Sequence, residues 1–293
     1  MYFSYFGLTK SPFEHASPFQ TFFINDAYRE AFVALRYGIQ LRLGLVVLTG
    51  ESGVGKTSLI TLFQNSAKKN VRLVVLSARE RSAGLLSCIL AGLGLDAPAE
   101  RRRAGIQSLK KYLLEQSNAG QIVAIVIDDA DELSLEDFAE IKILLSLRSD
   151  RTHLLQIVLA GSPALASPGG PVLRSLRQRV RVWSQIPPLA SHEVEAYIEH
   201  KLSSAGSVLR GLFQAGAVAR IAAYSHGIPG TIDALRERSL RLGLSQITGT
   251  HYRADRRECM EGPARRKRTG HRSAPMLRGS AISIGLGTRS GSA

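Results

Sequence analysis

Cysteine is scarce in this sequence, with Cys88 and Cys259 as the only two among 293 residues. Two cysteines supply neither a disulfide framework nor a cysteine zinc site, and this scarcity favours a reducing compartment, the cytoplasm. HExxH and paired-cysteine motifs are missing too, so a catalytic metal other than Mg²⁺ is not expected. Because no serine lies in a G-x-S-x-G motif, a serine hydrolase triad has no anchor.

Long apolar runs are also missing. The longest apolar stretch in the part expected to fold, Leu85–Leu95, has 11 residues, and a membrane-spanning helix needs about 20. We therefore expect no transmembrane segment. The opening residues, MYFSYFGLTKSPFEH, lack the basic start and apolar core of a secretory signal. These features predict a cytoplasmic protein.

Acidic residues are outnumbered, 24 against 38 lysines and arginines, which gives a formal net charge of +14. Half of this surplus lies between His251 and Ala293, where ten basic residues stand against three acidic ones. Because glycine, serine, arginine and proline dominate there, we expect residues 247–293 to be disordered. Such a tail binds DNA or an anionic membrane, or is merely solvated. A shifted reading frame or a truncated carboxyl-terminal region would also explain it.

Short apolar runs alternate with helical patterns in the first two thirds of the chain. Such runs are typical of strands buried on both faces, so the alternation predicts an α/β fold with a five-stranded parallel sheet. The strands are expected at Leu45–Thr49, Val71–Ser77, Ile122–Ile127, Leu154–Ala160 and Val180–Ile186. The helices are expected at residues 26–42, 56–69, 82–93, 99–116 and 135–148.

The pattern changes after Pro187-Pro188, where strand-like runs stop. Three helices are expected there, at residues 191–204, 212–225 and 231–242, with Ser191 as the N-cap of the first and His226-Gly227 ending the second. The predicted domains are an amino-terminal aromatic segment with a helix (1–44), an α/β core (45–188), a helical domain (189–246) and the basic tail (247–293).

The strongest chemical signal is the segment GESGVGKT at residues 50–57, which matches G-x-x-x-x-G-K-[ST] at every fixed position. Glycines let backbone N–H groups point at phosphate oxygens, and the helix N-terminus that follows adds a positive dipole end. Lys56 is expected to meet the β- and γ-phosphates. The residues predicted to bind nucleotide are Gly50, Glu51, Ser52, Gly53, Val54, Gly55, Lys56, Thr57 and Ser58.

A magnesium site is expected beside this loop. Mg²⁺ prefers octahedral oxygen ligation and keeps several waters, so the site needs a hydroxyl and a carboxylate. Thr57 supplies the first, and Asp128, at the end of the apolar run IVAIVID, supplies the second. Asp129 is the candidate for activating the attacking water. Asp131 and Glu132 are interpreted as acids at a helix start.

Several further motifs, in order along the chain, make the sequence resemble the AAA+ ATPases, more narrowly the family of general secretion pathway protein A (ExeA, GspA) and the related transposition helpers of the TniB kind. The resemblance covers roughly residues 1–245. Its carriers are Phe6-Gly7-Leu8, Pro12-Phe13, Arg29-Glu30-Ala31, Tyr37-Gly38-Ile39, Leu155–Leu159 with Gly161 and Pro163, Leu176–Arg179, Pro187-Pro188-Leu189, Glu195–Ile198 and Gly227-Ile228-Pro229.

The resemblance implies a P-loop ATPase that binds ATP with Mg²⁺, has a helical lid over the nucleotide, and works as a homo-oligomeric ring or filament. It implies that an arginine of one subunit reaches the γ-phosphate of its neighbour; Arg177 and Arg179 match that position, and Arg179 is favoured. A client in secretion, pilus assembly or transposition is implied, and DNA is a further candidate partner.

Three residues depart from the family pattern. Asp129 stands where relatives have glutamate, which shortens the proposed general base by about 1.5 Å. Ser162 replaces a glutamine, and Gly230 replaces an arginine on the lid, for which Arg236 and Arg238 are the nearest substitutes. Two hypotheses therefore stay open. The first is an ATP hydrolase. The second is a nucleotide-gated assembly protein that scarcely turns ATP over, with DNA as a candidate support for its assembly.

Aromatic residues gather at the amino terminus, at Tyr2, Phe3, Tyr5, Phe6, Phe13, Phe19, Phe22 and Phe23. Such a cluster either stacks on nucleic-acid bases or packs its segment against the core, and we favour packing. Trp183, the single tryptophan, is interpreted as a packing residue of the last strand.

Overall fold

The computed structural model describes residues 22–81, 83–96, 102–150, 152–167, 176–206 and 215–247. The chain divides into two compact units, which we describe separately. Ser17–Pro188 is the sheet unit, and Met1–Ala16 with Leu189–Ala293 is the helical unit. The predicted basic tail and most of the amino-terminal aromatic residues lie outside the described residues.

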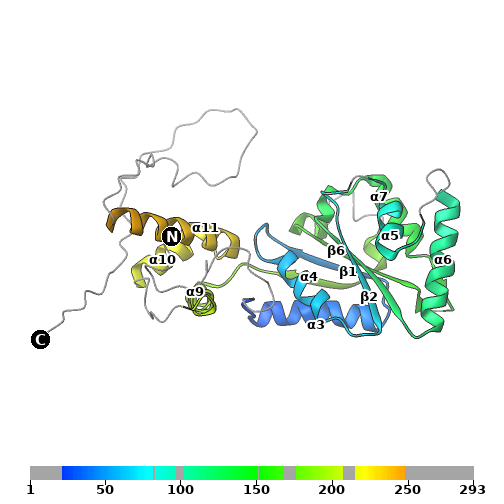
Figure 1. The fold of residues 1–293 in the computed structure, drawn as a ribbon, viewed down its shortest axis with the longest axis horizontal. Coiled ribbons are helices and arrows are strands. Elements are labelled where there is room, and N and C mark those ends of the chain that lie inside the picture. Colours follow the sequence, from blue (N-terminus) through cyan, green and yellow to red (C-terminus); the bar gives the residue numbers. More distant parts are fainter. Residues whose placement is uncertain are drawn as a thin grey trace, which may run out of the picture. The chain divides into compact units, whose positions relative to one another are not determined.

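A five-stranded parallel sheet forms the sheet unit, which confirms the predicted fold class (Figure 1). The order across the sheet is β2-β3-β6-β1-β7. Because all neighbouring strands pair in parallel, each connection between them is a crossover. The strands are β1 (Leu45–Gly50), β2 (Val71–Ser77), β3 (Ile122–Asp128), β6 (Leu155–Gly161) and β7 (Val180–Ile186). The three central strands are buried along their whole length, as their continuous apolar runs predict.

Helices cover both faces of this sheet. On one face, side chains such as Val47 and Ile125 join one buried core with α5 (Leu85–Leu93), α6 (Arg102–Asn118) and α7 (Leu135–Leu144). Strand side chains alternate between faces, so Val46 points the other way, toward α3 (Asp26–Gln40) and α4 (Lys56–Asn65). A Cβ at Gly38 of α3 would lie only 2.3 Å from Val46 Cγ2, so this helix needs a glycine to lie so close to the sheet.

Helix ends differ from the sequence prediction at several places. The helix predicted for 135–148 ends at Leu144, because a hairpin of β4 (Arg148–Ser149) and β5 (Thr152–His153) follows it. Asp150, with φ 52°, makes the tight turn of that hairpin. The helix predicted for 56–69 ends at Asn65, and the one predicted to begin at 82 begins at Leu85. Two-residue strands and helix ends depend on single hydrogen bonds, which leave no periodicity in the sequence.

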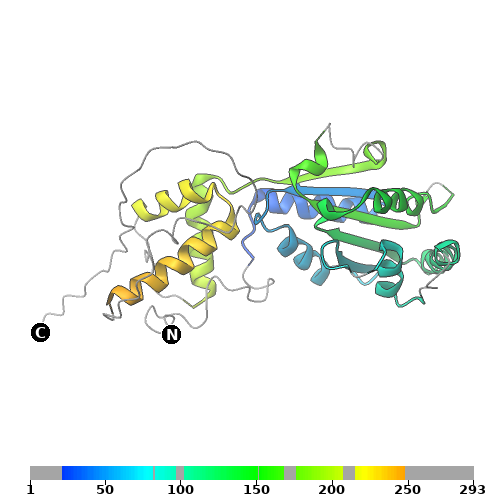
Figure 2. The ribbon, with the colours of Figure 1, turned by 90° about the horizontal axis from the view of Figure 1, so that it is seen from above.

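The helical unit contains α9 (Ser191–Ser204), α10 (Ala215–Ser225) and α11 (Pro229–Ile247), drawn from yellow-green to orange in Figure 2. Ser191 is not the N-cap of α9. That place belongs to Ala190, whose N–H donates to the Glu193 carboxylate at 2.8 Å. After α10, His226 and Gly227 have φ values of 50° and 73°, as predicted for a helix end.

Candidate nucleotide-binding site

The loop between β1 and α4 has the backbone that a phosphate loop needs. Gly53 and Gly55 have φ values of 84° and 98°, a left-handed region that is costly for other residues. At Gly50 a Cβ would lie 2.8 Å from the Ile186 carbonyl oxygen, so a side chain has no room there. All three glycines of the motif are therefore required by local geometry, and α4 starts directly after Gly55.

Lys56 lies over this loop. Its Nζ donates to the carbonyl oxygens of Gly50 at 2.8 Å and Glu51 at 3.1 Å, which holds the ammonium above the mouth of the loop. Burial lowers the pKa of Lys56, and the nearby carboxylates, Asp128 first among them, oppose that shift. A cation held over a glycine-rich loop at the start of a helix suits a polyanionic ligand.

The predicted magnesium pair is brought together by the fold. Thr57 Oγ1, on the first turn of α4, donates to Asp128 Oδ2 at 2.6 Å. The second carboxylate oxygen of Asp128 accepts the N–H of Asp129 at 2.9 Å. A hydroxyl and a buried carboxylate in contact beside a phosphate loop fit the donor set that Mg²⁺ takes with phosphate oxygens.

Asp129 has an unusual backbone. Its φ of 53° and ψ of 39° are left-handed, a conformation that aspartate tolerates better than most residues. The carboxylate is partly exposed, and its Oδ2 lies 3.9 Å from Arg79 Nε, in the segment after β2. The carboxylate of the predicted general base therefore stands in solvent near the loop with a cation close by.

A contact between Asp131 and Ser162 went unnoticed in the sequence. The Asp131 carboxylate accepts both the N–H of Ser162, at 2.6 Å, and its hydroxyl, at 2.8 Å. Asp131 is therefore more than an acid at a helix start, because it holds Ser162, the residue that replaces a glutamine of the family pattern. The two residues follow β3 and β6, which are neighbours in the sheet. Strand adjacency is the signal that would have revealed this pair.

Tyr28 is a second residue missed by motif analysis. Its hydroxyl donates to the carbonyl oxygen of Val54, inside the loop, at 2.5 Å. The Phe22 ring packs edge-on against Tyr28, with centroids 5.1 Å apart, so at least this member of the aromatic cluster serves packing. The amino-terminal end of α3 is thereby tied to the phosphate loop.

Arg177 and Arg179 are not part of this site. They form the short η3 helix (Arg177–Arg179) just before β7. Strand β7 runs parallel to β1, with Val180 beside Leu45 and Ile186 beside Gly50. The arginines and the loop therefore lie at opposite ends of a six-residue strand, about 20 Å apart at ~3.3 Å per residue.

On the helical unit, Gly230 is exposed in the first turn of α11. Arg236 is fully buried, and burial lowers its pKa to about 9, against the opposing effects of Asp233 and Tyr197. Because Arg236 lies inside its unit, it is not the replacement for the missing lid arginine. Arg238 is exposed.

Comparison with known proteins agrees with this geometry. A family model described as an AAA domain matches residues 41–167. General secretion pathway protein A of Aeromonas hydrophila is 30% identical over 246 residues, which cover 82% of this chain and 44% of that protein. The chain thus spans less than half the length of this relative.

Solved structures share the fold at low identity. Cdc6p from Pyrobaculum aerophilum superposes with a TM-score of 0.61 at 15% identity, over 82% of this chain and 66% of that one. Domain III of the Thermotoga maritima replication initiation protein DnaA gives 0.53 at 14%, over 83% and 93%. In the described part of the chain, no helix has the length and apolar character needed to cross a membrane. The sheet order, the phosphate loop and these matches show that the chain contains an AAA-type P-loop domain and is similar to general secretion pathway protein A.

Proposed function

We propose that this chain binds MgATP on the loop Gly50–Ser58 and hydrolyses it at an interface between two copies, using the cycle to remodel or load a partner assembly. The observation that carries the proposal is the contact of 2.6 Å between Thr57 Oγ1 and Asp128 Oδ2 beside the left-handed glycines of the loop. A structural turn needs no such pairing of hydroxyl and carboxylate.

Each residue has a distinct task in this proposal. Lys56 neutralises charge on the β- and γ-phosphates, and Thr57 with Asp128 holds the metal ion. Bound Mg²⁺ supplies charge neutralisation and orients the phosphate oxygens. Asp129 accepts a proton from the attacking water, which its partly exposed carboxylate is free to meet.

An interface between copies is needed because the arginine finger is remote from the loop of its own chain. Arg179 stands at the opposite end of β7 from the phosphate loop, as does Arg177. An arginine supplied in trans accelerates phosphoryl transfer by about 10³- to 10⁵-fold in related systems. Arg179 is therefore proposed to serve the site of the neighbouring subunit.

The proposal is tested by substituting Lys56→Ala and Arg179→Ala, with Lys69→Ala as the exposed control. Lys56→Ala should abolish both the binding heat of MgATP and its hydrolysis. Arg179→Ala should stall turnover while leaving the binding heat nearly intact. If Lys56→Ala hydrolysed ATP as fast as Lys69→Ala, the loop would not be the ATP-binding site.

A second candidate is a nucleotide-gated assembly protein that hardly hydrolyses ATP. Two observations favour it: the short carboxylate of Asp129 is 3.9 Å from Arg79 Nε, and Gly230 offers no cation on α11. Asp129→Glu decides between the candidates. A large gain in turnover supports the hydrolase, whereas unmeasurable turnover in both forms with ATP-driven assembly supports the gated protein.

The client is proposed from the relative with 30% identity, which is a general secretion pathway protein. A component of secretion or pilus machinery is therefore the first candidate, and a transposition complex is the alternative. A role on DNA predicts binding that weakens steeply with salt, with a slope of about −0.9 per phosphate neutralised. Affinity for a DNA duplex that stays flat from low to high salt would remove DNA from the partners.

A further inference from the structure

Most of the large apolar side chains that are exposed in the described part of the chain lie on two faces of the sheet unit. Among the described residues, eight large apolar side chains are exposed. Six of them fall on two faces, which we name the α3 groove and the α7 ridge. The groove contributes Val33, Tyr37, Leu41 and Trp183, and the ridge contributes Leu135 and Ile143.

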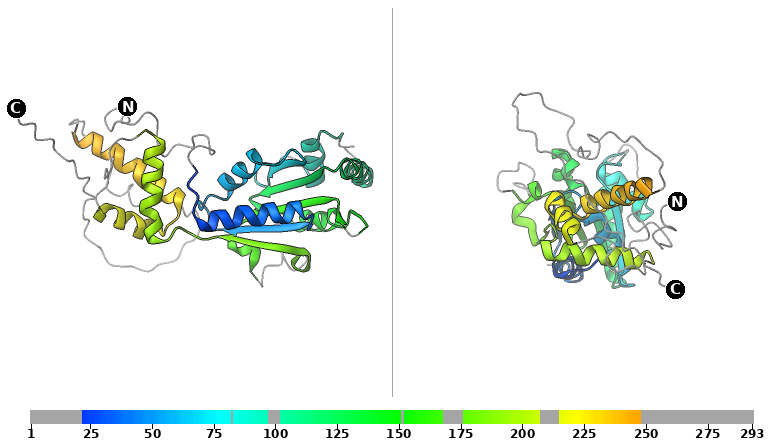
Figure 3. Two further views of the ribbon diagram at one scale, coloured as in Figure 1. Left: turned by 90° about the horizontal axis from the view of Figure 1, so that it is seen from below. Right: turned by 90° about the vertical axis from the view of Figure 1, so that its left-hand side faces the viewer.

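The α3 groove lies between α3 and the edge strand β7, which Figure 3 shows side by side. Val33, Tyr37 and Leu41 are spaced four residues apart, so they form one stripe, and they are 57%, 55% and 54% exposed. Trp183 is 44% exposed, which overturns its interpretation as a packing residue. A cavity of about 620 Å³ opens here, lined by Arg29, Glu30, Val33, Ala34, Tyr37, Arg181, Val182 and Trp183.

The α7 ridge has the matching period. Leu135, Ala139 and Ile143 are also spaced four apart and exposed, with Leu135 at 64% and Ile143 at 39%. Rows of side chains at this spacing pack into the grooves of another helix. The small Ala139 at the middle of the ridge, like Ala34 in the groove, permits close approach.

Charge complementarity gives the contact a direction. Arg181 and Glu30 border the groove, Glu136 and Lys142 border the ridge, and all four are exposed without an ion pair among the described residues. Because β7 runs opposite to α3, Arg181 lies toward the carboxyl end of α3 and Glu30 lies near its start. An antiparallel α7 places Glu136 beside Arg181 and Lys142 beside Glu30 at once.

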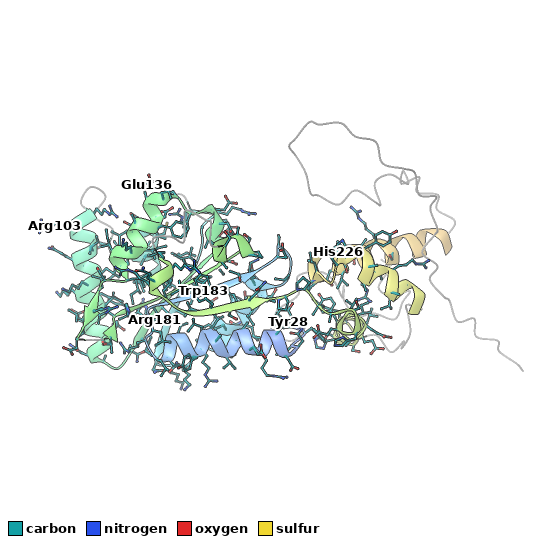
Figure 4. The ribbon with its side chains drawn as sticks, turned by 180° about the vertical axis from the view of Figure 1, so that it is seen from behind. Tyr28, Arg103, Glu136, Arg181, Trp183 and His226 are labelled. Carbon is teal, nitrogen blue, oxygen red and sulfur yellow. The ribbon has the colours of Figure 1, made fainter. Side chains whose placement is uncertain are left out.

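The groove and the ridge belong to opposite faces of the sheet, since α3 packs against Val46 and α7 packs on the side of Val47. Figure 4 accordingly shows Glu136 on a different side of the sheet unit from Arg181 and Trp183. A contact between two different faces is heterologous, so it builds rings or filaments rather than closed dimers.

We infer that the α7 ridge of one copy docks antiparallel into the α3 groove of the next copy, as the head-to-tail contact of the assembly. One consequence rests on the proposed function. Arg179 Nη1 lies 3.5 Å from the Lys142 carbonyl oxygen, at the carboxyl end of the ridge. Antiparallel docking brings that end to the start of the neighbour's α3, where Tyr28 holds the phosphate loop. The contact thus delivers Arg179 to the site in trans.

The test is charge reversal and rescue in the full chain, measured by sedimentation velocity with and without MgATP. Arg181→Glu and Glu136→Arg should each raise the concentration for half-assembly about tenfold or more, because like charges then face each other. The double variant should return to within about threefold of the wild type. Lys111→Glu, an exposed reversal on α6, is the control and should leave assembly unchanged.

Failure of the double variant to recover, an equal loss in Lys111→Glu, or a wild type that stays monomeric with MgATP at every concentration would each overturn the docking contact. A far-UV circular dichroism spectrum and thermal midpoint like those of the wild type confirm that each variant folds. Failure of the proposed function appears differently. Rescue of assembly with Arg179→Ala turnover unchanged would keep the docking contact and reject the trans arginine.

Discussion

The ion pair between Arg81 and Asp137 offers a strict test of how the sheet unit is held together. The guanidinium donates to both carboxylate oxygens, at 2.9 and 2.7 Å, and the two side chains are only 14% and 12% exposed. Asp137 also caps α7, because it accepts the N–H of Ser134 at 2.9 Å. Arg81→Met keeps the apolar stem and removes only the charged end, so the carboxylate loses its two charged hydrogen bonds.

The cost follows from burial. Breaking a buried ion pair costs about 3–5 kcal/mol, and since Asp137 keeps the Ser134 hydrogen bond and some solvent contact, we expect about 2–3 kcal/mol. In a domain of this size that corresponds to a fall of about 4–12 °C in Tm. Trp183 is the single tryptophan and lies in the sheet unit, so its fluorescence reports the unfolding of this unit in urea. Arg79→Met is the matched control, since Arg79 is 66% exposed and its removal should cost under about 1 kcal/mol.

The same pair predicts a pH dependence. Burial raises the pKa of Asp137, but hydrogen bonds from Arg81 and Ser134 outweigh it and hold the pKa below its usual value. The pair's contribution is therefore fully present above the unfolded pKa of about 3.9 and is lost as pH falls through the folded pKa. The stability gap between wild type and Arg81→Met should shrink below about pH 4. A gap under 1 kcal/mol at pH 7, or one equal to that of Arg79→Met, would refute the reasoning.

Three further outcomes are expected. Gln156→Leu should lower the free energy of unfolding in urea by about 2 kcal/mol or more. The buried amide of Gln156 accepts the N–H of Gly44 at 2.8 Å and donates to the His153 carbonyl oxygen at 2.9 Å, and the variant loses both hydrogen bonds. A decrease under about 0.5 kcal/mol would contradict this. Gly53→Ala should weaken ATP binding in calorimetry while Trp183 fluorescence still reports a folded unit, since φ 84° strains alanine; unchanged affinity contradicts this. Burial lowers the pKa of Lys56, so this side chain should lose its charge at a lower pH than an ordinary lysine, and ATP affinity should fall with it as the pH is raised. Lys56→Arg should remove this loss of affinity, because arginine stays charged.

The sequence predicted the sheet well because the central strands are buried on both faces. Their continuous apolar runs predicted the bounds of β1, β3 and β6 to within one residue, and the bounds of the edge strands β2 and β7 matched the prediction at both ends. Helix ends were predicted less well, since each depends on a local hydrogen bond. The hairpin of β4 and β5 was missed because its two-residue strands are too short to show alternation.

The candidate site divides in the same way. The loop and Asp128 were predicted because a motif and a strand end mark them. The contacts of Asp131 with Ser162 and of Tyr28 with Val54 were not, because each joins segments whose proximity follows from the strand order or from the placement of α3. Trp183 was wrongly interpreted because the sequence does not show which face of an edge strand is covered by a helix and which is exposed to solvent.

Helix α3 connects the two parts of the proposed mechanism. Tyr28 on its first turn holds the Val54 carbonyl of the phosphate loop, and Val33 and Tyr37 on the same helix line the α3 groove. A helix is stiff over this length, so a neighbour that packs along Val33 and Tyr37 also restrains Tyr28. In the proposed assembly, docking therefore steadies the phosphate loop of the subunit that receives the trans arginine. Assembly and nucleotide binding should for that reason favour each other, as linkage requires.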